Sequence, residues 1–148
     1  MKSIRLIFAL LLSSFFTFAQ EMKRVEITTG SNQLETFSIP LGEKGVVVLH
    51  HTGKAEFIIR KYNTDLEQVW IHQGSVDANL DYVTLCYDGK YLNLLFSRYK
   101  SNNYYIVRVN PRDGKLEKFQ IFSVEKMEIS NFKALNQSLF IGGIVNNT

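Results

Sequence analysis

The sequence FIIRKYNTDLEQVWIHQGS, residues 57–75, returns in degenerate form as YIVRVNPRDGKLEKFQIFSVE at residues 105–125. In both copies an apolar run reaches an asparagine, Asn63 or Asn110, and then enters a polar turn that contains an aspartate. Each copy leaves the turn through a leucine toward a bulky aromatic residue. Two apolar runs joined by a short polar turn predict a β-hairpin. The chain therefore carries the same hairpin twice.

Beyond the hairpins, nearly every periodic segment after residue 22 alternates with period two, and none shows a long run at helical spacing. Glycine, asparagine and aspartate mark the short connections between these segments. The expected strands are residues 24–29, 35–39, 46–51, 56–62, 67–73, 82–87, 91–99, 103–110, 116–122, 127–134 and 138–145. This pattern predicts an all-β fold.

The repetition also includes the flanking strands. Residues 46–49 match residues 92–95 and then residues 140–143, and a further strand type at 36–39, 83–87 and 130–134 is expected to close each unit. Residues 25–31 resemble the outgoing hairpin strand at 69–75. The chain is thus predicted to consist of four-stranded antiparallel meanders, with repeats near 46–90 and 92–136 and incomplete units on either side.

Four-stranded units of this period resemble the blades of β-propellers of the quinoprotein-like and WD40-like kinds. The segment VRVNPRDGKLEKF, residues 107–119, looks like a quinoprotein-type blade turn, in which Asn or Asp, a glycine and a docking aromatic follow one another. These places are filled by Asn110, Gly114 and Phe119. The first copy has Asn63 and Trp70 but no glycine.

The resemblance implies two to three blades over residues 23–148, whereas propellers typically have about four to eight. We therefore expect either the N-terminal part of a longer protein or an open stack that pairs with a partner or a second copy. Structural roles are predicted for five residues of the hairpins. Gly114 supplies a left-handed turn position, Asn63 and Asn110 shape the turns, and Trp70 and Phe119 dock on an adjacent sheet.

Residues 1–19 have the pattern of a secretory signal peptide, with Lys2 and Arg5 before an apolar run over residues 6–18. That run is shorter than the roughly 20 residues needed to cross a bilayer. We expect cleavage, an exported domain over residues 20–148, and membrane contact only through the uncleaved signal. The mature chain would be secreted, periplasmic or at the cell surface, and the short signal favours a bacterial source.

Charge and cysteine content exclude several function classes. Removing Lys2 and Arg5 lowers the net charge from +3 to +1, and the remaining charges are scattered along the chain. Nucleic-acid binding is not expected, because it requires clustered basic residues. The single cysteine, Cys86, excludes an internal disulfide framework, and its place in an alternating strand favours a small buried hydrophobe over a reactive thiol.

No catalytic motif, metal site or cofactor site is expected. The adjacent His50 and His51 would point to opposite faces of a strand and cannot share one ion. His72 lies on another strand, and the aspartates between residues 77 and 88 lack the glycine and closing acid of an EF-hand loop. The sequence therefore predicts a protein that is not an enzyme.

The most functional-looking surface is a tyrosine-rich and asparagine-rich stretch around residues 99–105. Aromatic rings with polar neighbours on a loop suit the binding of a glycan or a protein. The expected ligand-binding residues are Tyr99, Asn102, Asn103 and Tyr104. The simpler interpretation is ordinary strand alternation, with Tyr105 pointing inward and Tyr104 outward.

The predicted function is that of an exported binding or scaffold module of the cell envelope or extracellular space. The alternative is the N-terminal part of a propeller enzyme whose active-site residues lie in other blades. A further possibility is self-association through the apolar edge strand at residues 138–145, because unprotected edges invite pairing.

Overall fold

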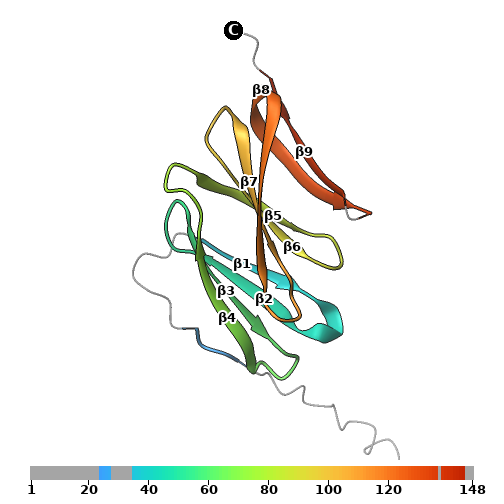
Figure 1. Ribbon diagram of the computed structural model, residues 1–148. Coiled ribbons are helices and arrows are strands. Elements are labelled where there is room, and N and C mark those ends of the chain that lie inside the picture. The colour runs from blue at the N-terminus through green and yellow to red at the C-terminus, as the bar shows by residue number, and fades with distance from the viewer. Residues whose placement is uncertain (1–23, 28–34, 137, 146–148) are drawn as a thin grey trace, which may run out of the picture.

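The computed structural model describes residues 24–27, 35–136 and 138–145 (Figure 1). The expected signal peptide, residues 1–19, lies outside the described residues. Residues 24–27, expected to begin the first strand, have no regular secondary structure, and the rest of that strand is not described. In the described part of the chain, no helix is both long and apolar enough to span a bilayer.

The described chain forms two antiparallel sheets, which confirms the prediction of an all-β fold. The first sheet has the order β1-β2-β3-β4 and the second the order β5-β6-β7-β8-β9. The elements are β1 (Glu35–Pro40), the 3-10 turn η1 (Gly42–Lys44), β2 (Val46–His51), β3 (Glu56–Tyr62), β4 (Gln68–Ser75), β5 (Asp81–Tyr87), β6 (Leu92–Ser97), β7 (Ser101–Val109), β8 (Leu116–Leu135) and β9 (Ser138–Ile144).

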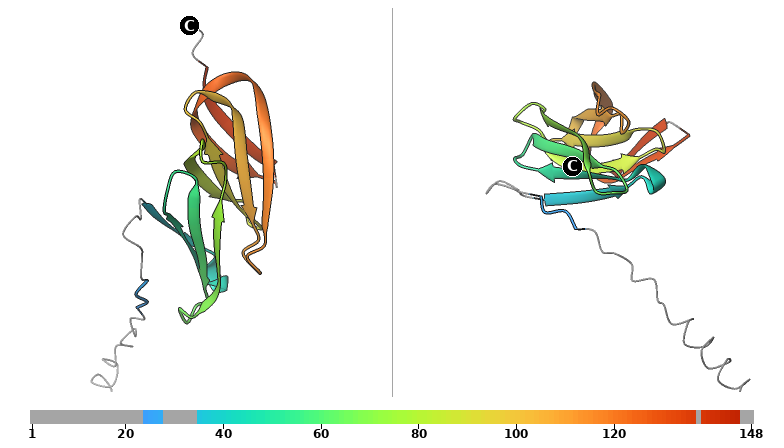
Figure 2. Two further views of the ribbon diagram at one scale, coloured as in Figure 1. Left: turned by 60° about the vertical axis from the view of Figure 1, so that its left-hand side comes forward. Right: turned by 90° about the horizontal axis from the view of Figure 1, so that it is seen from below.

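One element differs clearly from the sequence prediction, because the two strands expected at 116–122 and 127–134 are the single 20-residue strand β8. Its first half pairs with β7 as far as Met127, and its second half pairs with β9 from Glu128 onward. Residues 123–126 contain no glycine, proline, asparagine or aspartate that would stop a strand. In the left view of Figure 2, β8 arcs along the edge of the curled second sheet.

We call β9 and the second half of β8 the arm. The two sheets enclose the inter-sheet core, which is built by Val47, Leu49, Phe57 and Ile59 from the first sheet and Leu92, Leu94, Phe96, Val107 and Val109 from the second. The opposite face of the second sheet packs on the arm through Leu95, Tyr104, Ile106 and Phe132. The second sheet is therefore buried on both faces, which accounts for the continuous burial of β6.

The strand registers show which positions of the two sheets are equivalent. Leu49 pairs with Ile59 in the first sheet, and Leu95 pairs with Ile106 in the second. The same kind of irregularity occurs between β5 and β6, at Tyr82/Thr84, and between β8 and β9, at Ile129/Asn131. The arm thus repeats the first two strands of the second sheet. Each sheet also begins with the strand type that the sequence analysis placed at the end of a unit.

The registers correct the equivalence between Trp70 and Phe119. Trp70 lies opposite Lys61, whereas Phe119 lies opposite Ile106. A bulge at Lys61/Tyr62 shifts the pairing of β3 with β4, and the two hairpin turns differ in length. The residue that corresponds to Phe119 in the first sheet is His72, which lies opposite Ile59.

The expected apolar edge is present at β9, which has no second strand partner among the described residues. Its sequence contains neither a charged residue nor a proline. The outer face of the arm exposes three large apolar side chains, those of Leu135, Phe140 and Ile144. An edge of this kind is a template for strand pairing.

Candidate functional site

The tyrosine that the sequence analysis selected first, Tyr99, lies on the turn between β6 and β7 and is 72% exposed. Its hydroxyl donates a hydrogen bond of 3.2 Å to Oε2 of Glu128 on β8. The Nζ atom of Lys100 lies 5.4 Å from the centre of the Tyr99 ring. Lys100 itself occupies the left-handed region, with φ of 49°. The ring is therefore exposed but held between the turn and the arm.

The structure separates Tyr99 from Tyr104, which is only 1% exposed. The Tyr104 ring packs in the core beneath the arm, and its hydroxyl donates to the carbonyl oxygen of Ser101 over 2.8 Å. Tyr105 packs against the inter-sheet core. Neither tyrosine points simply outward, because both faces of the second sheet are covered. Tyr104 cannot contact a ligand at the surface.

The two predicted asparagines lie on β7 and are half-buried. The Asn103 side-chain oxygen accepts a hydrogen bond of 3.1 Å from Gln120 Nε2, and the Asn103 backbone N–H donates to Ser101 Oγ over 3.0 Å. These contacts join β7 to β8 and shape the start of β7. Asn102 and Asn103 do not line the cleft beside Tyr99.

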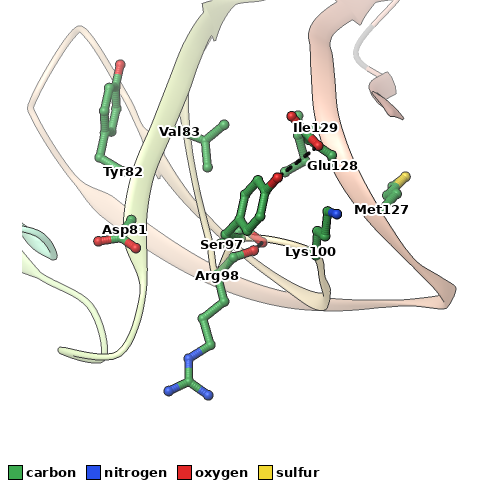
Figure 3. A pocket seen from close by; sticks show the side chains of 10 residues that line it. Asp81, Tyr82, Val83, Ser97, Arg98, Lys100, Met127, Glu128 and Ile129 are labelled. Atoms are coloured by element: carbon green, nitrogen blue, oxygen red, sulfur yellow. Dashed lines mark hydrogen bonds between the residues drawn. The ribbon is translucent and has the colours of Figure 1, made fainter. Parts of the chain in front are cut away.

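A cleft of about 330 Å³ lies beside Tyr99, between β5, the β6–β7 turn and β8 (Figure 3). Apolar side chains from β5 and β8 and charged side chains from all three segments line it. The apolar members are Val83, Met127 and Ile129, and the charged members are Asp81, Arg98, Lys100 and Glu128. Such a mixture of one exposed ring with donors and acceptors suits a hydroxyl-rich or peptide ligand.

Sequence reasoning missed Asp81, Arg98 and Glu128 as members of this site. Arg98 is held by a hydrogen bond of 3.2 Å from its Nε to the carbonyl oxygen of Asn79, and Asp81 lies 4.0 Å from Lys54 Nζ. Glu128 joins the cleft only because β8 runs unbroken past the β6–β7 turn. No local pattern in the sequence signals that meeting.

The residues expected to shape the hairpins lie in and next to the two turns. Asn63 Oδ1 accepts the backbone N–H groups of Asp65 and Glu67, each over 2.9 Å, and Asn110 Oδ1 accepts that of Arg112 over 2.9 Å. Both side chains thus fold the chain back in the same way, as Asx turns do.

Trp70 and Gly114 connect the two sheets. Trp70 Nε1 donates a hydrogen bond of 3.3 Å to the carbonyl oxygen of Pro111. Gly114 has φ of 74°, and an added Cβ there would overlap the ring of His72 and press on Trp70. The glycine therefore satisfies two requirements, a left-handed backbone and a close inter-sheet contact.

Phe119 packs differently from Trp70. It lies on the arm side of the second sheet, is 39% exposed and has the guanidinium carbon of Arg108 at 4.9 Å from its ring centre. Arg108 donates from Nε to Asn93 Oδ1 over 3.2 Å. Phe119 thus supports a polar network at a part of the sheet that the arm leaves open.

The remaining titratable groups fit structural roles. Burial, followed by the charge of Asp88, raises the pKa of Cys86 to about 11, so this thiol stays protonated at neutral pH. His50 contacts Thr36 over 3.1 Å, whereas His51 donates to the carbonyl oxygen of Lys54 over 3.1 Å from the other face of β2. No group of three His, Cys, Asp or Glu side chains suited to a metal ion occurs in the part of the chain that the structure describes.

No protein family, curated protein or solved structure matches this chain.

Proposed function

We propose that the chain is an exported binding module built from β-propeller-like units, and that its ligand binds in the cleft beside Tyr99. The proposal of propeller-like units is supported by the repeated strand order and register of the two sheets. The arm supports it as well, because its pairing has the same kind of register shift as the pairing of β5 with β6. Successive four-stranded sheets packed face to face are the building principle of propellers. Export to the periplasm, the cell surface or the medium is supported by residues 1–19.

The single observation that carries the binding proposal is the exposed and fixed ring of Tyr99. An aromatic ring that is held in place before the ligand arrives loses little conformational entropy on binding. The ring offers a flat apolar surface for a sugar, and the surrounding carboxylates and cations offer partners for hydroxyl or peptide groups. A glycan is therefore the first ligand class to test, and a protein segment is the second.

The test is a calorimetric titration of the full chain with soluble hexasaccharides of glucose, N-acetylglucosamine and mannose. Tyr99→Ala should weaken the binding of a recognised sugar by about three- to tenfold, the usual contribution of an aromatic contact. The matched control is Phe122→Ala, because Phe122 is also an exposed aromatic residue but lies outside the cleft. Equal affinities of the two variants would contradict a site at Tyr99, and failure of all three sugars would favour the protein ligand.

One observation favours an alternative function, the hydrolysis of a glycosidic bond in the Tyr99 cleft of this chain. Two carboxylates, Asp81 and Glu128, line the same cleft, and glycoside hydrolysis uses a pair of carboxyl groups. Release of reducing ends during the same titration, lost in Glu128→Gln, would support that alternative.

A scaffold role is supported by the open edge of β9 and the apolar outer face of the arm. Strand addition at this edge would extend the second sheet. Self-association through the arm would be supported by a light-scattering mass above that of one chain. The Phe140→Lys variant should then have a lower mass.

A further inference from the structure

Four basic side chains that are far apart in the sequence line one pocket between the two sheets. They are Lys44 on η1, Lys61 on β3, Lys90 on the β5–β6 turn and Arg112 on the β7–β8 turn. Figure 1 shows η1 and these two turns on the same side of the molecule. The basic residues are scattered along the chain, but these four lie together in space.

The pocket has a volume of about 530 Å³, and none of its described lining residues is acidic. The uncharged part of the lining is formed by Leu41, Tyr87, Gly89, Asn110 and Pro111. The β5–β6 and β7–β8 turns lie at the opposite ends of their strands from the β6–β7 turn. This pocket is therefore separate from the Tyr99 cleft.

The charges of the four cations are not neutralised by ion pairs within the described residues. The ion pairs found there join Arg24 to Glu26 and Lys54 to Asp81. Lys61 is half-buried on the face of β3 that meets the second sheet, and it forms no ion pair with a carboxylate of the described residues. The Nζ atom of Lys90 lies 5.0 Å from the centre of the Tyr91 ring.

The acidic residue of the β5–β6 turn, Asp88, already forms several hydrogen bonds. Its carboxylate accepts the backbone N–H groups of Lys90 over 2.8 Å and Tyr91 over 2.6 Å, and Asn93 Nδ2 over 3.3 Å. Desolvation alone would raise the pKa of Asp88, but these donors and the charge of Arg108 hold it below its usual value. Asp88 is thus a structural group of the turn and does not line the basic pocket.

The walls of the pocket are fixed by their own contacts. Pro111 is buried, and its carbonyl oxygen accepts the hydrogen bond from Trp70 described above. Tyr87 donates from its hydroxyl to the carbonyl oxygen of Gly89 over 2.8 Å. These bonds tie the two turns to the sheets, so the cations are carried on a preformed frame.

From this geometry we infer that the pocket binds a small ligand with at least two anionic groups, such as a diphosphate or a sulfated or carboxylated sugar. The volume falls in the range of small-molecule sites, about 300–1,000 Å³. Lysines serve as point charges for such groups, and the guanidinium of Arg112 can form paired hydrogen bonds with anionic oxygens.

The experiment is a calorimetric titration of the full chain with three probes, namely pyrophosphate, a disulfated disaccharide and citrate. The pocket variant is Lys44→Gln with Arg112→Gln, because both side chains are exposed and their loss should not affect folding. The control variant is Lys126→Gln with Lys133→Gln, which removes the same charge from exposed positions outside the pocket. Lys61→Gln is a third variant, and thermal midpoints verify that all three fold.

At least one probe should bind, and its affinity should fall about tenfold or more in the pocket variant and in Lys61→Gln, but less than about twofold in the control. Comparison of the three probes then tells whether phosphate, sulfate or carboxylate is preferred. Equal losses in the pocket and control variants would overturn the proposal in favour of diffuse attraction by net charge. Absence of binding by all three probes would overturn it as well.

Discussion

The first and second sheets share a strand order, but they fill equivalent positions with different residues. Val48, His50 and Arg60 lie on the outer face of the first sheet, where the second sheet has Leu94, Phe96 and Val107 in its core. In the described structure the first sheet packs against another sheet on one face only, whereas the second has packing partners on both. Val48 and His50 are nevertheless only 8% and 3% exposed. The comparison teaches that a face packed against another sheet is filled with apolar residues, while the other face of the first sheet admits a buried histidine and a half-buried arginine.

On the other face of each sheet the pattern is reversed, with the apolar residue in the first sheet and the polar residue in the second. Val47 lies in the inter-sheet core, but the equivalent Asn93 in the second sheet is fully buried in a polar network with Asp88 and Arg108. The arm covers only part of this face, so polar groups there reach solvent through Arg108, which is half-buried. What covers a position therefore decides its chemistry more than its place in the repeat.

The largest loss of stability should come from a residue of the inner, second sheet, compared with its equivalent in the first sheet. Phe96→Ala should reduce the free energy of unfolding by about 3–5 kcal/mol, because Phe96 is fully buried against Phe57 at a ring distance of 5.8 Å. His50→Ala, the same place in the first sheet, should cost about 1 kcal/mol. Urea unfolding of both variants measures the difference, and equal losses would show that the two sheets are equally covered.

An intermediate effect is expected from the two hairpin turns, in which Leu66 and Gly114 occupy the same left-handed position with φ of 63° and 74°. Gly114→Leu should cost about 2–4 kcal/mol, because a side chain there combines backbone strain with overlap on His72. Leu66→Gly should instead stabilise the protein slightly, by up to about 1 kcal/mol, because it relieves the strain of a left-handed leucine.

The control for these turn variants is Gly89→Ala, since Gly89 also has positive φ, at 88°, but has open space around its Cβ position. Its cost should be that of strain alone, about 1–2 kcal/mol. If thermal denaturation gave Gly114 and Gly89 variants the same loss, the inter-sheet contact at Gly114 would contribute nothing.

The smallest effect concerns the pH dependence of the outer face. Burial, followed by the charge of Arg60, lowers the pKa of His50, whose side chain is 3% exposed and whose Nε2 has no hydrogen-bond partner in the described structure. The unfolded chain therefore binds more protons than the folded one between the lowered value and about 6.5, and stability should fall as the pH drops through that interval.

His50→Phe, which copies Phe96, should remove this part of the pH dependence. The pH-dependent part of the free energy of unfolding that His50 contributes should stay below about 1 kcal/mol, the typical effect of a point substitution. Urea midpoints of the wild type and the variant at pH 7.5 and 5.5 provide the measurement. Parallel losses in the two proteins would mean that His50 titrates normally.

Local features of the fold were predictable from the sequence. The bounds of β2 and β3 agree with the prediction, and Asn63 and Asn110 shape turns as their spacing suggested. Period-two alternation and turn residues act over a few neighbouring residues, so a single sequence displays them.

The continuity of β8 was not predictable in the same way. Ser75–Val76 and Ser123–Val124 are the same dipeptide, yet Val76 packs beside the inter-sheet core while Val124 is 99% exposed. After the first, Asp77 accepts the backbone N–H of Asn79 over 2.9 Å and turns the chain. After the second, Glu125 and Lys126 continue the strand, which carries Glu128 to the Tyr99 cleft.

The sequence alone thus determined the all-β class, the repeated hairpin and most strand bounds, because each follows from interactions between residues close in the chain. Only the tertiary structure decided that Tyr104 is buried, that Glu128 meets Tyr99, and that four separate cations share one pocket. Coverage of a sheet face and convergence of distant turns depend on which surfaces pack together. That packing is set by the whole apolar surface to be buried and leaves no mark at any single position.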